Sequence, residues 1–123
     1  MLNVIKANTT LTSVDLAYNA LDGRTAQRFT NALVAAPLVM LELRGNCLGS
    51  EAYRIFSGSG ELSKLKYLNL AENGIDAGAA TRLAAEAKAA ALEELVLDNN
   101  TLGLGTIWSM AARRACVCGA IQC

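Results

Sequence analysis

Apolar residues recur along this chain at a fixed interval of 27 residues. The interval is marked by four asparagines, which are Asn19, Asn46, Asn73 and Asn100. An apolar residue stands eight, five and three positions before each asparagine, and again two and ten positions after it. Because 53% of the chain is hydrophobic, agreement at all twenty of these positions by chance is on the order of a few in a million. The period therefore indicates a structural repeat.

The residues that precede each asparagine alternate with the period of a β-strand. In the third interval, Leu68 and Leu70 should face inward and Asn69 outward. The chain then turns at Asn73, where a buried side-chain amide can bond exposed backbone groups of its own turn and the adjacent one. One such unit cannot bury its apolar side alone, so neighbouring units must stack into a solenoid.

The residues that follow each asparagine predict a returning helix in two of the intervals. Phe29, Ala32 and Leu33 have helical spacing, and the alanine-rich residues 79–91 form a similar stripe. In the second interval, the Gly-Ser residues 57–60 should end the helix early. We therefore expect about four 27-residue β-α repeats in an α/β solenoid.

The repeat positions also predict how the chain is divided. The chain opens in mid-repeat, without a polar capping unit, so we expect a piece of a longer array. The expected segments are the end of a preceding repeat helix at residues 1–10, repeat one at 11–37, repeat two at 38–64, repeat three at 65–91, a partial repeat four at 92–110, and an irregular cysteine-containing tail at 111–123.

The pattern L-x-x-L-x-L-x-x-N-x-L with a helical second half resembles the ribonuclease-inhibitor-like class of leucine-rich repeats. Residues 65–75 match it best, and residues 7–16 are similar to repeats of NOD-like receptors of the NLRC type. The resemblance covers about residues 1–110. It implies a horseshoe arc with parallel strands on its concave face and helices outside. It also implies a protein-binding or ligand-sensing role, often autoinhibitory, within a larger protein.

Side chains that point outward from the strands of such an arc would line up in columns about 4.8 Å apart. They would form a mildly acidic surface on which Tyr18, Met40 and Tyr67 serve as contact anchors for a basic segment of a partner protein. The alternative is that they are ordinary solvated strand residues. The candidate binding residues are Asp15, Tyr18, Met40, Glu42, Arg44, Tyr67, Asn69, Glu72, Glu94 and Asp98.

Charge and cysteine usage narrow the class of partner and the location. Eleven basic and eleven acidic residues cancel, so neither nucleic acid nor an anionic membrane is the expected partner. The N-terminus lacks the apolar stretch of a signal peptide, and no apolar run has the length of a membrane span. Three of the four cysteines fall in the last eight residues rather than being spread as a disulfide framework. We therefore expect a cytoplasmic protein.

Candidate catalytic chemistry is sparse. Histidine, the commonest general base and metal ligand, is absent. Cys116, Cys118 and Cys123 could supply thiolates, but their spacing differs from that of paired zinc ligands. We therefore expect no enzyme activity, no metal and no cofactor, and favour a protein-protein interaction scaffold within a larger leucine-rich-repeat protein. Two alternatives stay open: a regulator of a small GTPase resembling the Ran GTPase-activating proteins, and a thiol- or metal-responsive tail.

Overall fold

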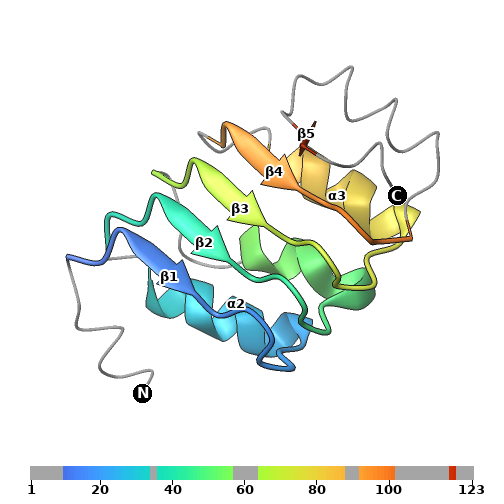
Figure 1. The fold of residues 1–123 in the computed structure, drawn as a ribbon, viewed down its shortest axis with the longest axis horizontal. Helices are drawn as coiled ribbons and strands as arrows, with labels where there is room; N and C mark the ends of the chain where they lie inside the picture. Colours follow the sequence, from blue (N-terminus) through green and yellow to red (C-terminus); the bar gives the residue numbers. More distant parts are fainter. Residues whose placement is uncertain (1–9, 34–35, 57–63, 88–91, 102–116, 119–123) are drawn as a thin grey trace.

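The computed structural model describes residues 10–33, 36–56, 64–87, 92–101 and 117–118, and these form an α/β repeat fold of two layers (Figure 1). The parallel sheet is one layer, and the helices cover one of its faces (Figure 1). In chain order the elements are β1 (Ser13–Asp15), α2 (Gly23–Ala32), β2 (Met40–Glu42), the 3₁₀ helix η1 (Gly49–Phe56), β3 (Tyr67–Asn69), α3 (Ala77–Ala87), β4 (Glu94–Val96) and β5 (Val117–Cys118).

The strands lie side by side in chain order, and their register follows the sequence repeat. Val14 pairs with Leu41, Leu41 with Leu68, and Leu68 with Leu95, so corresponding residues lie 27 positions apart. β5 departs from this spacing, since Leu95 pairs with Val117. β5 also lies in the tail that the repeat pattern predicts to be irregular. Strand pairing uses main-chain groups, so β5 can extend the edge of β4 without carrying the repeat motif.

The apolar residue in the middle of each strand β1–β4 and the leucine two positions after it form the core. Leu68, Leu70 and Leu97 are fully buried between the sheet and the helical layer, as their alternation predicts. On the first coil, Val14 and Leu16 are only partly buried, because β1 has a neighbouring strand on one side only. Stacking against a second coil is therefore what completes the burial of each coil.

The helical layer explains why the second interval differs from its neighbours. The side chain of Asp22 accepts a hydrogen bond from the Thr25 N–H at 2.8 Å, and Asp76 accepts one from Ala79 in the same way, so α2 and α3 begin at good N-caps. The equivalent position in the second interval is Gly49, which is the first residue of the 3₁₀ helix η1. η1 packs against both α2 and α3.

The described part of each predicted apolar stripe is buried, and residues 84–91 of the second stripe lie outside the described side chains. Phe29 and Leu33 at α2 and Leu83 in α3 are buried in the core, as expected. The described part of η1 ends at Phe56, and the Gly-Ser residues 57–60 lie outside the described residues. None of the helices within the described ranges combines the length and apolarity that a membrane crossing requires.

Candidate functional site

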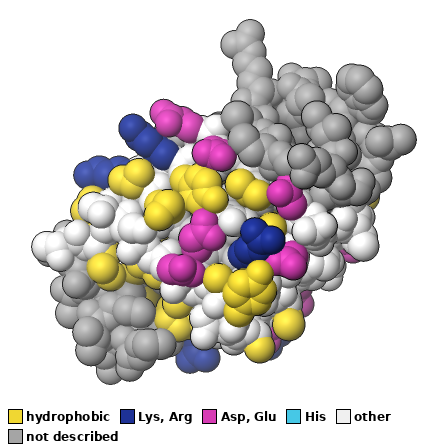
Figure 2. Space-filling view, viewed as in Figure 1, with side chains coloured by type: hydrophobic (Ala, Val, Ile, Leu, Met, Phe, Trp, Pro, Cys, Tyr) yellow, Lys and Arg dark blue, Asp and Glu magenta, His cyan; other side chains and the backbone are white. Residues whose placement is uncertain are grey.

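The candidate site is the face of the sheet opposite the helices, which we call the open face. It is formed by the outward side chains of β1–β4 and of the bends that follow them. Figure 2 views the molecule from this side and shows hydrophobic side chains interspersed with acidic ones. None of the described helices lies over it (Figure 1).

An apolar patch lies near the start of β2 and β3. Val39 and Met40 are 38% and 37% exposed, which is unusual for the large hydrophobic residues that the structure describes. Tyr67 is the register neighbour of Met40 and is half-buried beside it. Burial raises the pKa of Tyr67, and the nearby carboxylates of Glu42 and Glu94 raise it further. The patch therefore offers apolar contact area within an acidic surrounding.

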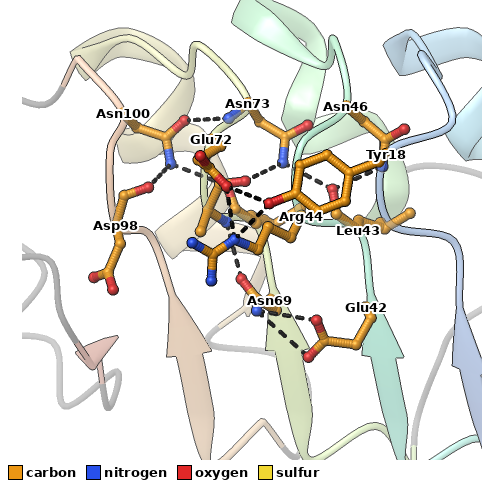
Figure 3. Close-up of polar contacts among 12 residues, drawn as sticks. Tyr18, Glu42, Leu43, Arg44, Asn46, Asn69, Glu72, Asn73, Asp98 and Asn100 are labelled. Carbon is orange, nitrogen blue, oxygen red and sulfur yellow. Dashed lines mark hydrogen bonds and ion pairs between the residues drawn. The ribbon is translucent and has the colours of Figure 1, made fainter.

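Carboxylates border this patch on neighbouring strands. Asp15 and Glu42 are register partners on β1 and β2, and Glu94 is the partner of Tyr67 on β4. The amide Nδ2 of Asn69 donates to both carboxylate oxygens of Glu42, at 3.0 and 3.4 Å (Figure 3). Asp15 Oδ1 accepts from the Ala17 N–H at 2.9 Å. The bonds restrain both carboxylates without neutralising their charge.

A three-residue cluster, which we call the Tyr18–Arg44–Glu72 clamp, crosses the open face where the strands end (Figure 3). Arg44 Nε donates to Glu72 Oε2 at 2.6 Å and to the Tyr18 hydroxyl oxygen at 3.1 Å. The Tyr18 hydroxyl donates to the same Glu72 oxygen at 2.7 Å. These contacts raise the pKa of Arg44 and lower the pKa of Glu72, in both cases chiefly through the bond between the two residues.

Backbone conformation places the clamp residues. Tyr18, Gly45, Glu72 and Asn99 stand at equivalent positions, and all four have φ between 55° and 72°. This left-handed bend turns each coil away from the sheet. The Tyr18 ring lies against Gly45, so a Cβ added at Gly45 would overlap the ring. Glycine at this coil therefore lets Tyr18 reach across to Glu72, two coils away.

The repeated asparagines form a row beside the clamp, but their contacts alternate. Asn46 Oδ1 accepts from the N–H groups of Asn19 and Leu21, both at 3.0 Å, while its Nδ2 donates to the Leu16 and Leu43 carbonyls. Asn100 makes the equivalent bonds to the coil before it. Asn73 uses only its Nδ2, which donates to Leu43 and Ala71, and its buried Oδ1 has no partner within the described part of the chain.

The turn after each asparagine accounts for this alternation. Ala20 and Gly74 have φ of 53° and 65°, and their turns aim two N–H groups at the asparagine of the next coil. In the second coil, Cys47 instead forms a β-bridge with Asp22, and the positive φ moves to Gly49. The Gly49 N–H then donates to the main-chain oxygen of Asn73 rather than to its side chain.

The structure brings most of the predicted binding residues onto one face, with two differences in exposure. Asn69 is only 6% exposed, because its side chain turns down to Glu42 and to the Ala71 N–H; it supports the surface rather than projecting from it. Asn19, expected to be buried like its equivalents, is exposed because it belongs to the first described coil. The exposed candidates are Asp15, Tyr18 and Met40, and the half-buried ones are Glu42, Arg44, Tyr67, Glu72, Glu94 and Asp98.

Sequence reasoning missed two features of this surface, the exposure of Val39 and the role of Gly45 beneath the Tyr18 ring. Val39 stands just before the alternating positions, so the strand pattern does not mark it as outward. Gly45 was recognisable as the one glycine in a column otherwise occupied by Tyr18, Glu72 and Asn99. The predicted asparagine column was visible, but the alternation of its hydrogen bonds depends on the turns of neighbouring coils.

The cysteines and acidic residues are the only candidate metal ligands of this sequence, which has no histidine. The described residues contain no cluster of three or more His, Cys, Asp or Glu side chains that could hold a metal ion. Cys116 and Cys123 lie outside the described residues, and Cys118 is described only as part of β5. Cys47 is an exposed free thiol. The thiol- or metal-responsive tail therefore stays a prediction.

Comparison with known proteins agrees with the repeat pattern. The family model described as Leucine Rich repeat matches residues 7–26 and 61–84. No curated protein matches the chain. The matched segments include β1 with its following turn, and β3 with most of α3. These two segments thus support a leucine-rich repeat in the parts of the chain that they cover.

Proposed function

We propose that the leucine-rich repeats of this chain form a protein-interaction module, and that a segment of a partner protein lies across the open face of β1–β4. Leucine-rich repeats generally mediate protein–protein interaction. The observation that carries the proposal is a sheet with helices on one face and, on the other, exposed Met40 beside half-buried Tyr67, with exposed Val39 next to Met40 in the chain. Exposed apolar and aromatic side chains within a polar rim are typical of interaction sites.

The charges of the open face favour a basic partner segment. Asp15, Glu42 and Glu94 border the apolar patch, and none of them has an ion pair with a basic side chain of the described residues. Lysine and arginine combine an aliphatic stem with a cationic head. Such a side chain can lay its stem on Met40 and Tyr67 while its charge meets these carboxylates, whereas an acidic side chain would be repelled.

We further propose an arc of about four repeats of the ribonuclease-inhibitor-like class, similar to those of NOD-like receptors. The 27-residue register and the helices on one face support this shape. Helices are about 10 Å wide, whereas strands lie about 4.8 Å apart, so stacked β-α units must curve with the strands inside. A cytoplasmic location is part of the proposal, because a reducing compartment keeps a thiol such as Cys47 free.

Selection from a displayed library of random peptides tests the interaction proposal. Four strands span roughly 15–20 Å, which an extended peptide crosses in about five or six residues, so short peptides suffice. Selected peptides are then titrated against Met40→Arg, which places a bulky cation on the open face. Asn31→Arg is the matched control, because Asn31 is exposed on α2 in the helical layer.

We expect Met40→Arg to weaken binding about tenfold or more and Asn31→Arg to change it by less than about twofold. A few contacts at the centre of an interface contribute most of its binding free energy. Circular dichroism establishes that both variants fold. Selected peptides that bind Met40→Arg as tightly as the unchanged chain would remove the open face as the site. The small-GTPase alternative has its own test, because an unchanged rate of GTP hydrolysis by Ran in the presence of the chain would remove it.

A further inference from the structure

We propose that Glu72 is a specificity-determining residue that holds Arg44 in an internal pair and so makes the open face select cationic over anionic segments. This inference rests on the proposed function, because it concerns which segments the open face accepts. Of the ten candidate residues of that face, Arg44 is the single cation. The state of its charge therefore decides whether an acidic segment finds a cation among these ten residues.

The geometry shows how Arg44 is held. Its Nε donates to Glu72 Oε2 at 2.6 Å and to the Tyr18 hydroxyl at 3.1 Å. The Tyr18 hydroxyl donates to that same carboxylate oxygen at 2.7 Å, which closes a three-membered set of bonds (Figure 3). Charge-assisted bonds of this length are the stronger kind. Binding a partner carboxylate with the same Nε–H would require breaking this set.

Pairing at Nε, rather than burial, offsets the charge of Arg44, whose Nη groups form no bond within the described part of the chain. The side chains of Arg44 and Glu72 are 42% and 38% exposed, so an incoming segment can reach both. An exposed guanidinium with free donors is well suited to bind carboxylates in a planar, two-bond geometry. Removing the charge of Glu72 should therefore leave Arg44 in place with its positive charge no longer offset.

The clamp is built from residues of three successive coils, which makes it a property of the stack. Tyr18 comes from the first coil, Arg44 from the second and Glu72 from the third. Gly45 lets the Tyr18 ring cross the second coil, because any larger side chain there would overlap the ring. Glu72 is in turn positioned by its left-handed backbone, and its N–H donates to the Asp98 carbonyl at 2.9 Å.

Glu72→Gln tests the inference, and Glu94→Gln is the matched control. Both substitutions remove one negative charge from the open face, but Glu94 forms no ion pair with a described basic residue, so its loss frees no cation. The probe is an alternating glutamate–serine peptide, titrated at low ionic strength, where exposed charges are least screened. Binding is followed by NMR chemical shifts, including that of the Arg44 Nε–H group.

We expect Glu72→Gln to bind the glutamate–serine peptide with about fivefold or more higher affinity than the unchanged chain, and the peptide to shift the Arg44 Nε–H resonance. Glu94→Gln should stay within about twofold of the unchanged chain, because a single exposed charge contributes little. Adding Arg44→Gln to Glu72→Gln should abolish the gain. Equal behaviour of Glu72→Gln and Glu94→Gln would overturn the inference, as would a gain that survives Arg44→Gln.

The outcomes separate this inference from the proposed function. If random-peptide selection yields no binders that depend on Met40, the interaction proposal fails whatever Glu72→Gln does. If such binders exist but Glu72→Gln gains no affinity for the acidic probe, the open face remains the site and the role of Glu72 is refuted.

Discussion

Replacing the repeated asparagines one at a time should have unequal effects, although the sequence pattern treats them as equivalent. Asn46 and Asn73 are both buried, at 5% and 2% exposure, and both occupy the same repeat position. Their hydrogen bonds differ. Asn46 uses both ends of its amide, whereas Asn73 has a buried Oδ1 without a partner among the described residues.

Counting what each substitution leaves unpaired gives the expected size. In Asn46→Ala, the N–H groups of Asn19 and Leu21 lose their acceptor, and the Leu16 carbonyl loses its donor. Leu21 is buried, so its N–H has least access to replacement water. Each buried unsatisfied group costs about 1–3 kcal/mol, so we expect Asn46→Ala to lower the free energy of unfolding by about 2–4 kcal/mol.

Asn73→Ala should cost much less. The Leu43 carbonyl keeps its bond from Asn46 Nδ2, and the Ala71 carbonyl keeps its bond from the Gly45 N–H. The substitution also removes an oxygen that was buried without a bond. We therefore expect a loss of about 0.5–1.5 kcal/mol, the range of an ordinary net hydrogen bond.

Urea unfolding followed by circular dichroism measures both values, provided that the dependence on urea concentration is the same in each variant. Asn100→Ala serves as a second test of the alternation, because Asn100 bonds like Asn46 and should rank with it. Equal losses for Asn46→Ala and Asn73→Ala would refute the reasoning, since they would mean that the unpartnered oxygen has no energetic consequence.

Three further predictions concern the clamp and the helix caps. Gly45→Ala should lower the melting temperature clearly more than Gly74→Ala, because both add a side chain at positive φ but only the first overlaps the Tyr18 ring. In a Tyr18→Ala background, thermal melting should give similar losses for the two substitutions. Asp76→Ala should cost about 1 kcal/mol in urea unfolding through loss of the α3 cap, and no loss would contradict the capping role. The hydrogen bond from the Thr25 N–H lowers the pKa of Asp22. The bond therefore stabilises the fold above the ordinary aspartate pKa, and this stabilisation is lost as pH falls through the lowered pKa. Acid unfolding of Asp22→Asn, which caps without titrating, should lack this part of the pH dependence, and a profile equal to that of the unchanged chain would argue against the role of Asp22.

Much of the fold could be predicted because it follows from local side-chain periodicity. The alternation of Leu68 and Leu70 places a strand, and the spacing of Phe29 and Leu33 places a helix. The constant interval then predicts which strands are neighbours and in what register. β5 was not predicted, because Val117 pairs with β4 outside the 27-residue interval.

The details of the candidate site depend on contacts between coils, and the sequence repeat predicts such contacts less well than it predicts strands and helices. The outward direction of Arg44 and Glu72 follows from strand alternation and the bend, but their pairing requires Arg44 to reach one coil onward and one column over. The alternating asparagine bonds did have a sequence signal. Asp22 and Asp76 stand three residues after their asparagines, whereas Gly49 stands at that position in the second coil. A two-coil period could have been inferred from it.

The central claim is that a partner segment is held by the open face of the strands. Mapping amide chemical shifts while a library-selected peptide is added to the full chain tests it most directly. We expect the largest changes at Met40, Glu42 and Tyr67 and their strand neighbours. Changes concentrated on the exposed surfaces of α2, η1 and α3, with β1–β4 unperturbed, would contradict it.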